Sequence, residues 1–343
     1  MEALKIKNFG FDYAVGNETA LRDISFTVNE GDFIVVCGPS GCGKSTLLKS
    51  IKPQLKPFGT TEGSIEFYGE DVYSLPEERT AGEIGFVMQN PDAQIVTDKV
   101  WHELAFGLEN LGVATPIIRS RVAEMANYFG IHNWFRKKTA ELSGGQKQLL
   151  NLASIMLMQP KLLILDEPSS QLDPIAAREF LENVRKINLE LGTTIIITEH
   201  NLEEVYGYAD KVLLMENGEV KKFLPPQEMA QYLATEEHEG MYKALPTPAR
   251  MYGSVLKGEC PLSIVEGRSW FSRLVIIPCF DLLGRFIHNY GLVILLMTLL
   301  IKLLISPLTI KSYKSTAKMQ VIKPEIDKLN EKYPNEKDAM KKQ

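Results

Sequence analysis

A glycine-rich segment constrains the fold of this chain more than any other part of it. Residues 38–46 read Gly-Pro-Ser-Gly-Cys-Gly-Lys-Ser-Thr, directly after the apolar run 33–37 and before Leu47 and Leu48. This order predicts a strand, a tight turn and a helix, which is the arrangement of a phosphate-binding loop. A simple glycine turn would explain the glycines, but it would not explain the Lys-Ser pair that follows them.

The chemistry of a bound triphosphate gives each part of this loop a role. Its glycines let the backbone curl so that N–H groups converge on phosphate oxygens, and the next helix adds the positive end of its dipole. Lys44 is predicted to bridge the β and γ phosphates of ATP, and Ser45 to offer its hydroxyl to Mg²⁺. The predicted nucleotide-binding residues of the loop are Gly38, Ser40, Gly41, Cys42, Gly43, Lys44, Ser45 and Thr46.

A second motif follows about 120 residues later. The aliphatic run 162–165 has the pattern of a buried strand, and it ends in Asp166-Glu167-Pro168. Open α/β sheets place their ligand chemistry at such strand ends. Asp166 is predicted to hold Mg²⁺, mostly through water, and Glu167 to orient or polarise the water that attacks the γ phosphate. A plain capped turn is the alternative, but the helical stretch 144–158 just before the strand argues against it.

Residues 142–146 read Leu-Ser-Gly-Gly-Gln, which resembles the signature of the ABC family of ATPases. The resemblance implies an α/β phosphate-loop ATPase that works as a head-to-tail dimer, with an identical chain or with a paralogue. In that family the signature of one subunit contacts the ATP held by the other. The residues that would do so are Ser143, Gly144, Gly145 and Gln146, and one isolated copy is expected to hydrolyse ATP poorly.

Four single residues fall where the ABC pattern has functional side chains. Tyr13 resembles the aromatic residue that stacks on adenine, and Gln89 the glutamine that contacts Mg²⁺ and senses the transport subunit. Asp173 resembles the aspartate of the dimer-contact loop, and His200 the histidine that touches the γ phosphate. A lone tyrosine or histidine is more often a surface or core residue, so these assignments depend on their order along the chain.

A narrower resemblance begins at Gln89. The runs 89–96 and 103–110, with Thr-Glu-His at 198–200, are similar to ATPase subunits of energy-coupling factor importers of vitamins or of cobalt and nickel ions. The resemblance implies that a membrane scaffold subunit docks on residues 89–130, that a separate membrane protein binds the substrate, and that no nucleic acid is bound. It also implies a peripheral location on the cytoplasmic face of the membrane. The alternative is an ordinary amphipathic insert that packs by its leucines.

The distribution of apolar residues predicts the domain organisation. Strand-like segments near 3–8, 21–27 and 63–68 suggest an antiparallel subdomain, and further apolar strands alternating with helical patterns predict a mainly parallel core sheet. The expected division is an ATPase domain at 1–225 with a helical insert at 90–140, a small extension at 226–271 that is rich in loops at 235–262, and a separate tail at 272–343. The four cysteines form no Cys-x-x-Cys pair, which suits a reducing compartment.

The tail differs in character from the rest of the chain. Residues 291–310 carry one charge, Lys302, and are numerous enough to cross a bilayer, so a partly transmembrane helical tail is expected. Phe-Asp-Leu-Leu-Gly at 280–284 and Ser-Pro-Leu-Thr at 306–309 resemble the YidC family of membrane protein insertases. That family implies that Lys302 faces a substrate groove. The match covers only 272–343 and lacks the family's other spans, so no insertase activity is expected.

The two parts of the chain predict opposite sides of a membrane. From residue 302 onward there are ten lysines and five acidic residues, which predicts that the tail's end stays in the cytoplasm and places residues 1–290 outside. An ATPase needs cytosolic ATP. A junction of two unrelated genes near residues 271–272 would resolve this.

Two functions remain as alternatives to the importer: an ABC ATPase outside transport and a protein related to membrane insertases. The transported substrate, and whether the dimer partner is identical or a paralogue, are not encoded in these motifs.

Overall fold

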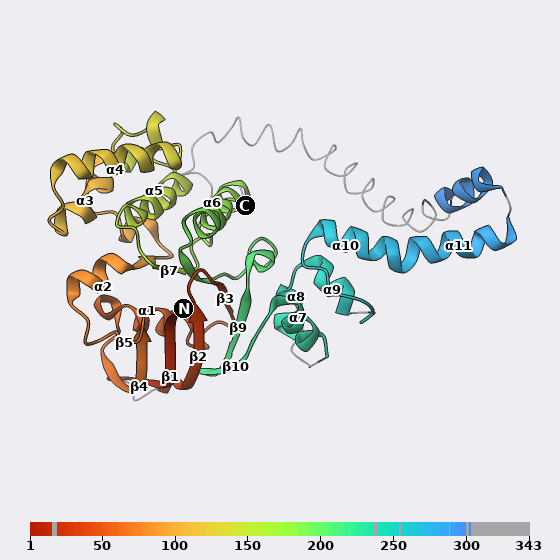
Figure 1. Ribbon diagram of the computed structural model, residues 1–343, viewed down its shortest axis with the longest axis horizontal. Coiled ribbons are helices and arrows are strands. Elements are labelled where there is room, and N and C mark those ends of the chain that lie inside the picture. The colour runs from red at the N-terminus through yellow and green to blue at the C-terminus, as the bar shows by residue number, and fades with distance from the viewer. Residues whose placement is uncertain (16–18, 236–238, 254, 288, 300–301, 303–343) are drawn as a thin grey trace, which may run out of the picture. The chain divides into compact units, whose positions relative to one another are not determined.

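The chain folds into two compact units, residues 1–267 and 268–343. The computed structural model describes residues 1–15, 19–235, 239–253, 255–287, 289–299 and 302. Figure 1 shows the strands gathered in the first unit and only helices in the described part of the second. Because the two units are separate bodies, each is described by itself.

The first unit contains an antiparallel sheet, as the sequence predicts. Its strands are β1 (Glu2–Tyr13), β2 (Thr19–Asn29), β4 (Gly59–Phe67) and β5 (Glu70–Asp71), in the order β2-β1-β4-β5. Residues of one face, such as Leu4, Ile6 and Phe11, are fully buried, whereas Lys5, Lys7 and Asp12 next to them are more exposed. This alternation is typical of a sheet with one face in the core and one in solvent.

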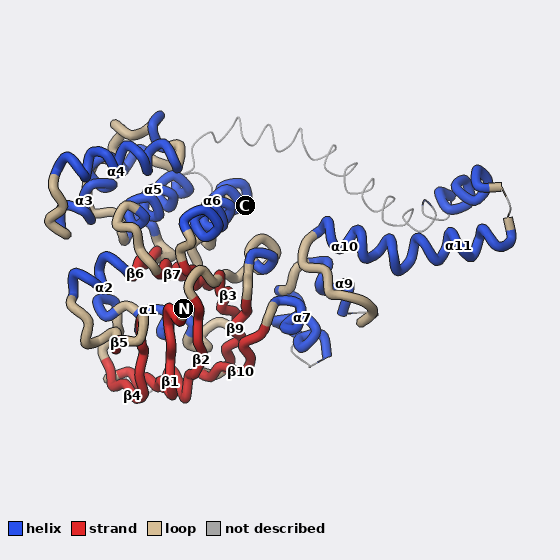
Figure 2. Tube along the Cα trace, in the orientation of Figure 1, coloured by secondary structure: helices blue, strands red, loops and turns tan. Residues whose placement is uncertain are grey.

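The second sheet of this unit has six strands and is mainly parallel. Its members are β3 (Phe33–Cys37), β6 (Ile84–Val87), β7 (Leu162–Asp166), β8 (Thr194–Thr198), β9 (Lys211–Glu216) and β10 (Glu219–Leu224), in the order β10-β9-β3-β8-β7-β6. The exception to parallel pairing is β10, which runs antiparallel to β9. Strands β3, β6, β7 and β8 are buried over their whole length, because helices cover both faces (Figure 2). Their carboxyl ends therefore meet at one edge of the sheet.

Helices complete the first unit. Helix α1 (Lys44–Ile51) follows β3 directly, α2 (Glu77–Glu83) precedes β6, and α6 (Pro174–Leu191) connects β7 to β8. The predicted helical insert contains α3 (Val100–Asn110) and α4 (Thr115–Tyr128), and it packs on α5 (Gly144–Met156). Leu104 and Leu108 are buried, so these leucines belong to the core as the amphipathic alternative expects.

The end of the first unit corrects one prediction. Residues 235–262 were expected to be rich in loops, but the described part of this region contains α8 (Glu239–Ala244) and α9 (Thr247–Gly253), after α7 (Pro226–Thr235). These helices are short, so few turns repeat the apolar spacing that would reveal them in the sequence. Burial of Leu245, Ala249 and Tyr252 accounts for them, because tertiary contacts stabilise helices that would be marginal alone.

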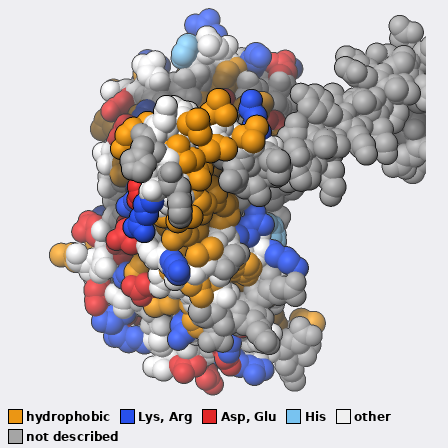
Figure 3. Space-filling model, turned by 90° about the vertical axis from the view of Figure 1, so that its right-hand side faces the viewer, with side chains coloured by type: hydrophobic (Ala, Val, Ile, Leu, Met, Phe, Trp, Pro, Cys, Tyr) orange, Lys and Arg blue, Asp and Glu red, His pale blue; other side chains and the backbone are white. Residues whose placement is uncertain are grey.

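The described part of the second unit is helical. It contains the end of α10 (Ile264–Phe271), a π-helical turn at Ser272–Ile276, α11 (Ile277–Phe286) and helical residues at 290–299. No helix within the described residues is long and apolar enough to cross a bilayer. Half of the predicted span 291–310 lies outside the described residues, as do Lys311 and everything after it. Hydrophobic side chains remain exposed in this unit, and they include Ile277, Leu282, Leu292, Ile294, Leu295 and Leu299. Figure 3 shows a band of hydrophobic side chains on the face that it draws.

Candidate functional site

The loop between β3 and α1 has a backbone that only glycine can adopt at two positions. Gly38 has a φ of 153°, and a Cβ atom there would lie 2.1 Å from the carbonyl oxygen of Met215. Gly43 has a φ of 100°, and its Cβ would lie 2.8 Å from the carbonyl oxygen of Ala20. The positive φ angles and the close backbone contacts both exclude larger residues. The spacing of the glycines in the sequence therefore follows from the backbone that this turn requires.

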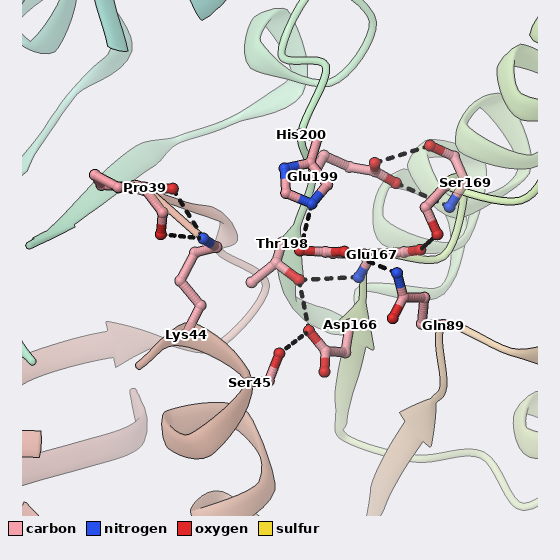
Figure 4. A network of polar contacts seen from close by, with 12 residues as sticks. Pro39, Lys44, Ser45, Gln89, Asp166, Glu167, Ser169, Thr198, Glu199 and His200 are labelled. Atoms are coloured by element: carbon pink, nitrogen blue, oxygen red, sulfur yellow. Dashed lines mark hydrogen bonds and ion pairs between the residues drawn. The ribbon is translucent and has the colours of Figure 1, made fainter. Parts of the chain in front are cut away.

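Lys44, the first residue of α1, carries its charge at the centre of this loop. The side chain is buried, and Nζ donates to the carbonyl oxygens of Gly38 at 2.8 Å and Pro39 at 3.0 Å (Figure 4). Both acceptors are uncharged, and no carboxylate among the described residues forms an ion pair with Lys44. The ammonium group thus keeps its positive charge for an anionic ligand in the loop.

Three oxygen-bearing side chains meet behind the loop. The hydroxyl of Ser45 donates to Oδ1 of Asp166 at 2.9 Å, and the hydroxyl of Thr198 donates to the same oxygen at 3.0 Å. Asp166 ends β7 and is only 7% exposed, and Thr198 ends β8. One carboxylate and one hydroxyl with space for water and phosphate oxygens fit Mg²⁺, which keeps several of its waters and prefers oxygen ligands. The donor set therefore fits the predicted ion.

Glu167 is held by contacts from two neighbouring strand ends. Its φ is +48°, and its backbone N–H donates to the carbonyl oxygen of Thr198 at 3.1 Å and to its hydroxyl at 2.9 Å. The carboxylate accepts from Nε2 of Gln89 at 3.0 Å and lies 2.9 Å from Nε2 of His200 (Figure 4). These contacts hold the Glu167 carboxylate so that it faces the cavity. Such a group can accept a proton from a water molecule placed beside it.

These groups face one cavity of about 650 Å³. Ten of the predicted site residues line it: Tyr13, Ser40, Gly41, Gly43, Lys44, Ser45, Thr46, Gln89, Glu167 and His200. Asp166 reaches it through Ser45, whereas Gly38 and Cys42 lie within the loop and do not line it. The Tyr13 hydroxyl lies 2.9 Å from that of Thr46, and its ring packs edge-on against Phe11. The residues expected to act on one triphosphate thus converge.

The sequence analysis missed four lining residues and one bridging residue. Thr19, Ala20, Asn217 and Gly218 complete the cavity wall. The backbone N–H of Gly218 donates to the carbonyl oxygen of Cys42 at 3.1 Å, so the turn between β9 and β10 supports the loop. The Asn-Gly dipeptide of that turn was a readable signal. The sequence carries no signal for the bridge that Thr198 makes between Asp166 and the backbone of Glu167, because this bridge depends on the pairing of β7 with β8.

The signature residues lie apart from this cavity. Ser143 is exposed and caps α5 by accepting from the backbone N–H of Gln146, whose side-chain oxygen accepts from Ser143 in return. Asp173 caps α6 in the same way, through Ile175 and Ala176. None of Ser143, Gly144, Gly145, Gln146 and Asp173 lines the cavity. The predicted contact of these residues with nucleotide is therefore not made at this cavity by the residues of the same chain that line it.

Comparison with sequence families gives two matches to different parts of the chain. Residues 21–170 match the ABC transporter family. Residues 282–343 match the family of the 60Kd inner membrane protein. The two matches do not overlap, and the second begins near the change in character that the sequence shows.

Curated relatives cover the first part of the chain. A protein of Bacillus anthracis named "Putative ABC transporter ATP-binding protein" is 49% identical over 216 residues, which is 63% of this chain and 39% of that protein. A protein of the same name from Methanosarcina acetivorans is 35% identical over 265 residues, 77% of this chain and 41% of that protein. The chain spans less than half the length of these relatives.

The fold of the first part of the chain resembles those of solved structures. CbiO1 from Clostridium perfringens, described as part of the ABC transporter complex CbiONQ, is 31% identical with a TM-score of 0.61, over 71% of this chain and 99% of that one. The ATP-binding cassette MJ0796, solved as a dimer bound to ADP and Pi, is 24% identical with a TM-score of 0.57, over 65% and 98% of the two chains. At that identity the second likeness concerns the fold alone.

Proposed function

The chain belongs to the ABC transporter family, whose members hydrolyse ATP, and from this premise we propose that it is the ATP-hydrolysing subunit of an energy-coupling factor type importer. The observation that carries the proposal is that Lys44, Ser45 and Glu167 line one cavity, with Asp166 bonded to the Ser45 hydroxyl. The likeness to CbiO1, a part of a transporter complex, supports the importer class. The importer would carry vitamins or transition-metal ions.

Each group at the cavity has a definable task in ATP hydrolysis. Lys44 exchanges its two loop carbonyls for the β and γ phosphate oxygens, which bear more negative charge. Ser45 and Asp166 hold Mg²⁺, and the ion, when bound, neutralises charge that develops on the phosphates. Glu167 orients the attacking water and accepts its proton. Gln89 and His200 keep that carboxylate turned toward the γ phosphate.

A second ATPase chain completes the site in this proposal. The two chains face each other head to tail, so that Ser143 and Asp173 of one reach the ATP bound by the other. Ser143 is exposed, and α5 and α6 begin close together, since a Cβ on Gly145 would lie 2.9 Å from that of Ala176. One surface thus presents both groups. Binding of ATP closes the dimer and hydrolysis reopens it, with an identical chain or a paralogue as partner.

The helical insert offers a surface for the membrane scaffold subunit. A groove of about 410 Å³ opens between α3 and α4, and its apolar lining with Glu109 and Arg119 suits an amphipathic helix. Its lining residues are Trp101, Ala105, Glu109, Thr115, Ile118, Arg119, Val122, Ala123 and Phe135. Trp101 is 42% exposed there. A large aromatic side chain left in a groove is the usual anchor of a protein interface.

Trp101→Ala is expected to weaken capture of the scaffold about 30-fold, because buried aromatic anchors contribute 2 kcal/mol or more. The measurement is affinity purification of the full chain from detergent-solubilised membranes of the source organism, with the captured proteins identified by mass spectrometry. The wild type should recover a polytopic scaffold and a substrate-binding membrane protein. Leu189→Ala, which truncates an exposed apolar residue on α6, is the control and should change nothing. Recovery of nucleic acid alone would contradict the importer.

The C-terminal unit has no part in this cycle. Its match to an inner membrane protein family starts at residue 282, and its exposed hydrophobic side chains suit contact with a membrane rather than with nucleotide. We propose that it comes from a second gene joined near residues 271–272, and that the ATPase part is peripheral on the cytoplasmic face of the membrane. Sequencing one uninterrupted molecule of source DNA across the junction decides this. A continuous reading frame there would refute a joining artefact.

A further inference from the structure

Glu199 is a buried carboxylate that none of the roles above uses. It lies between Thr198 and His200 after the end of β8, and it is 5% exposed. Both of its oxygens are engaged by one residue: Oε1 accepts from the backbone N–H of Ser169 at 3.1 Å, and Oε2 from the Ser169 hydroxyl at 2.8 Å (Figure 4). The pair joins segments 30 residues apart.

Ser169 belongs to the loop that carries the groups of the reaction. This loop, residues 167–173, starts at Glu167, which lines the cavity, and ends at Asp173, which caps α6. Its own hydrogen bonds are short-range: Ser170 binds the carbonyl oxygen of Glu167, and the Leu172 N–H binds that of Ser169. A displacement at Ser169 would therefore move the whole loop.

Three consecutive residues hold this loop from the neighbouring strand. Thr198 fixes the backbone of Glu167, His200 contacts its carboxylate, and Glu199 fixes Ser169 two residues further on. Without Glu199 the loop would be held at its first residue, Glu167, and not again before its last residue, Asp173. Glu199 is thus the contact that sets the direction of the loop as it leaves the site.

Burial acts against the charged form of Glu199, and its hydrogen bonds act in favour of it. Burial raises the pKa of Glu199 to about 7, against the opposing effect of the Ser169 hydrogen bonds. A buried carboxylate is costly unless its hydrogen bonds compensate, and a glutamine of the same shape would avoid that cost. A charged acceptor makes stronger hydrogen bonds than a neutral one, however, and so it holds its donor more firmly.

We propose that Glu199 is a positioning residue for ATP hydrolysis, which holds Ser169 and thereby fixes the loop that carries Glu167 and leads to Asp173. The proposal rests on the proposed ATPase function. It assigns to Glu199 no contact with nucleotide or Mg²⁺.

The test is steady-state ATP hydrolysis by the full chain, at pH 8 and at the protein concentration that gives the highest wild-type rate, together with thermal unfolding. Glu199→Gln is expected to unfold at the same or a higher temperature than the wild type, yet to lose about 3- to 10-fold in kcat, with the KM for ATP within about 2-fold. Glu199→Ala is expected to lose more than about 10-fold in kcat. A residue with a merely structural role would not combine retained stability with a lower kcat.

Ser169→Ala and a matched carboxylate provide the controls. Ser169→Ala should lower kcat, and adding it to Glu199→Ala should have little further effect, because both changes remove one contact. Asp32 is a half-buried carboxylate outside the site, and it accepts the backbone N–H of Asn29 at 2.9 Å. Asp32→Asn should leave kcat unchanged.

Unchanged kcat in Glu199→Gln and Ser169→Ala would overturn the inference, and so would losses that add fully in the double variant. A rise in KM for ATP at constant kcat would also overturn it, since nucleotide binding would then be the affected step. A wild-type chain that binds no ATP would instead remove the ATPase proposal itself. The two failures are therefore distinguishable.

Discussion

Lys44→Ala is expected to weaken ATP binding by at least about 30-fold, because loss of one partner of a buried charge pair costs about 2–5 kcal/mol. The chain should still fold, since Lys44 contacts only carbonyl oxygens of its own loop and the sulfur of Cys42. Isothermal titration calorimetry of the full chain with ATP and Mg²⁺ measures the effect. Lys49→Ala removes the same charge from the same helix and should stay within about 2-fold of the wild type.

The comparison between these two variants separates the effect of the loop lysine from a general effect of positive charge. A general loss of positive charge would weaken both variants alike, whereas the account expects the loss in one only. Normal ATP affinity in Lys44→Ala would show that the triphosphate does not lie in this loop, and it would remove the basis for the roles of Ser45 and Asp166.

Glu167→Gln is expected to slow ATP hydrolysis by about 10³-fold and to leave ATP binding intact, because general-base catalysis typically contributes 10²–10⁴-fold. Glutamine has the same shape and can keep the contacts with Gln89 and His200. The ATP-bound chain should therefore accumulate in its closed, dimeric form. Phosphate release measures turnover, and sedimentation measures the dimer.

A second glutamate serves as the control for this substitution. Glu182 lies on the exposed face of α6 and pairs with Arg178, and such a surface pair contributes little. Glu182→Gln should hydrolyse ATP like the wild type. Unchanged turnover in Glu167→Gln would exclude this carboxylate from the mechanism, whatever its position in the structure.

The parts of the site that the sequence predicts are those with a local physical cause. Gly38 and Gly43 are required by a backbone that only glycine adopts, so their spacing identifies the loop without any tertiary information. The buried strands are read equally well, because full burial in a parallel sheet demands an uninterrupted apolar run. The mainly parallel core and the antiparallel sheet follow from these patterns, and the structure confirms both.

The parts that escaped prediction depend on contacts between distant segments. Thr198 joins Asp166 to the backbone of Glu167 only because β8 pairs with β7. Glu199 gains its partner Ser169 for the same reason, and nothing in the run around it distinguishes a buried carboxylate from an exposed one. The short helices α8 and α9 likewise depend on packing.

The most direct measurement of the account asks whether one chain completes the site of another. With ATP and Mg²⁺, the Glu167→Gln chain should sediment as a dimer, alone or with the companion ATPase recovered by co-purification. Gly144 is exposed, and a side chain there would meet nothing within 4 Å in its own chain. Adding Gly144→Arg should leave ATP affinity unchanged and abolish the dimer, because the new side chain fills the space that the partner's triphosphate must enter. A dimer that still forms would contradict the shared site.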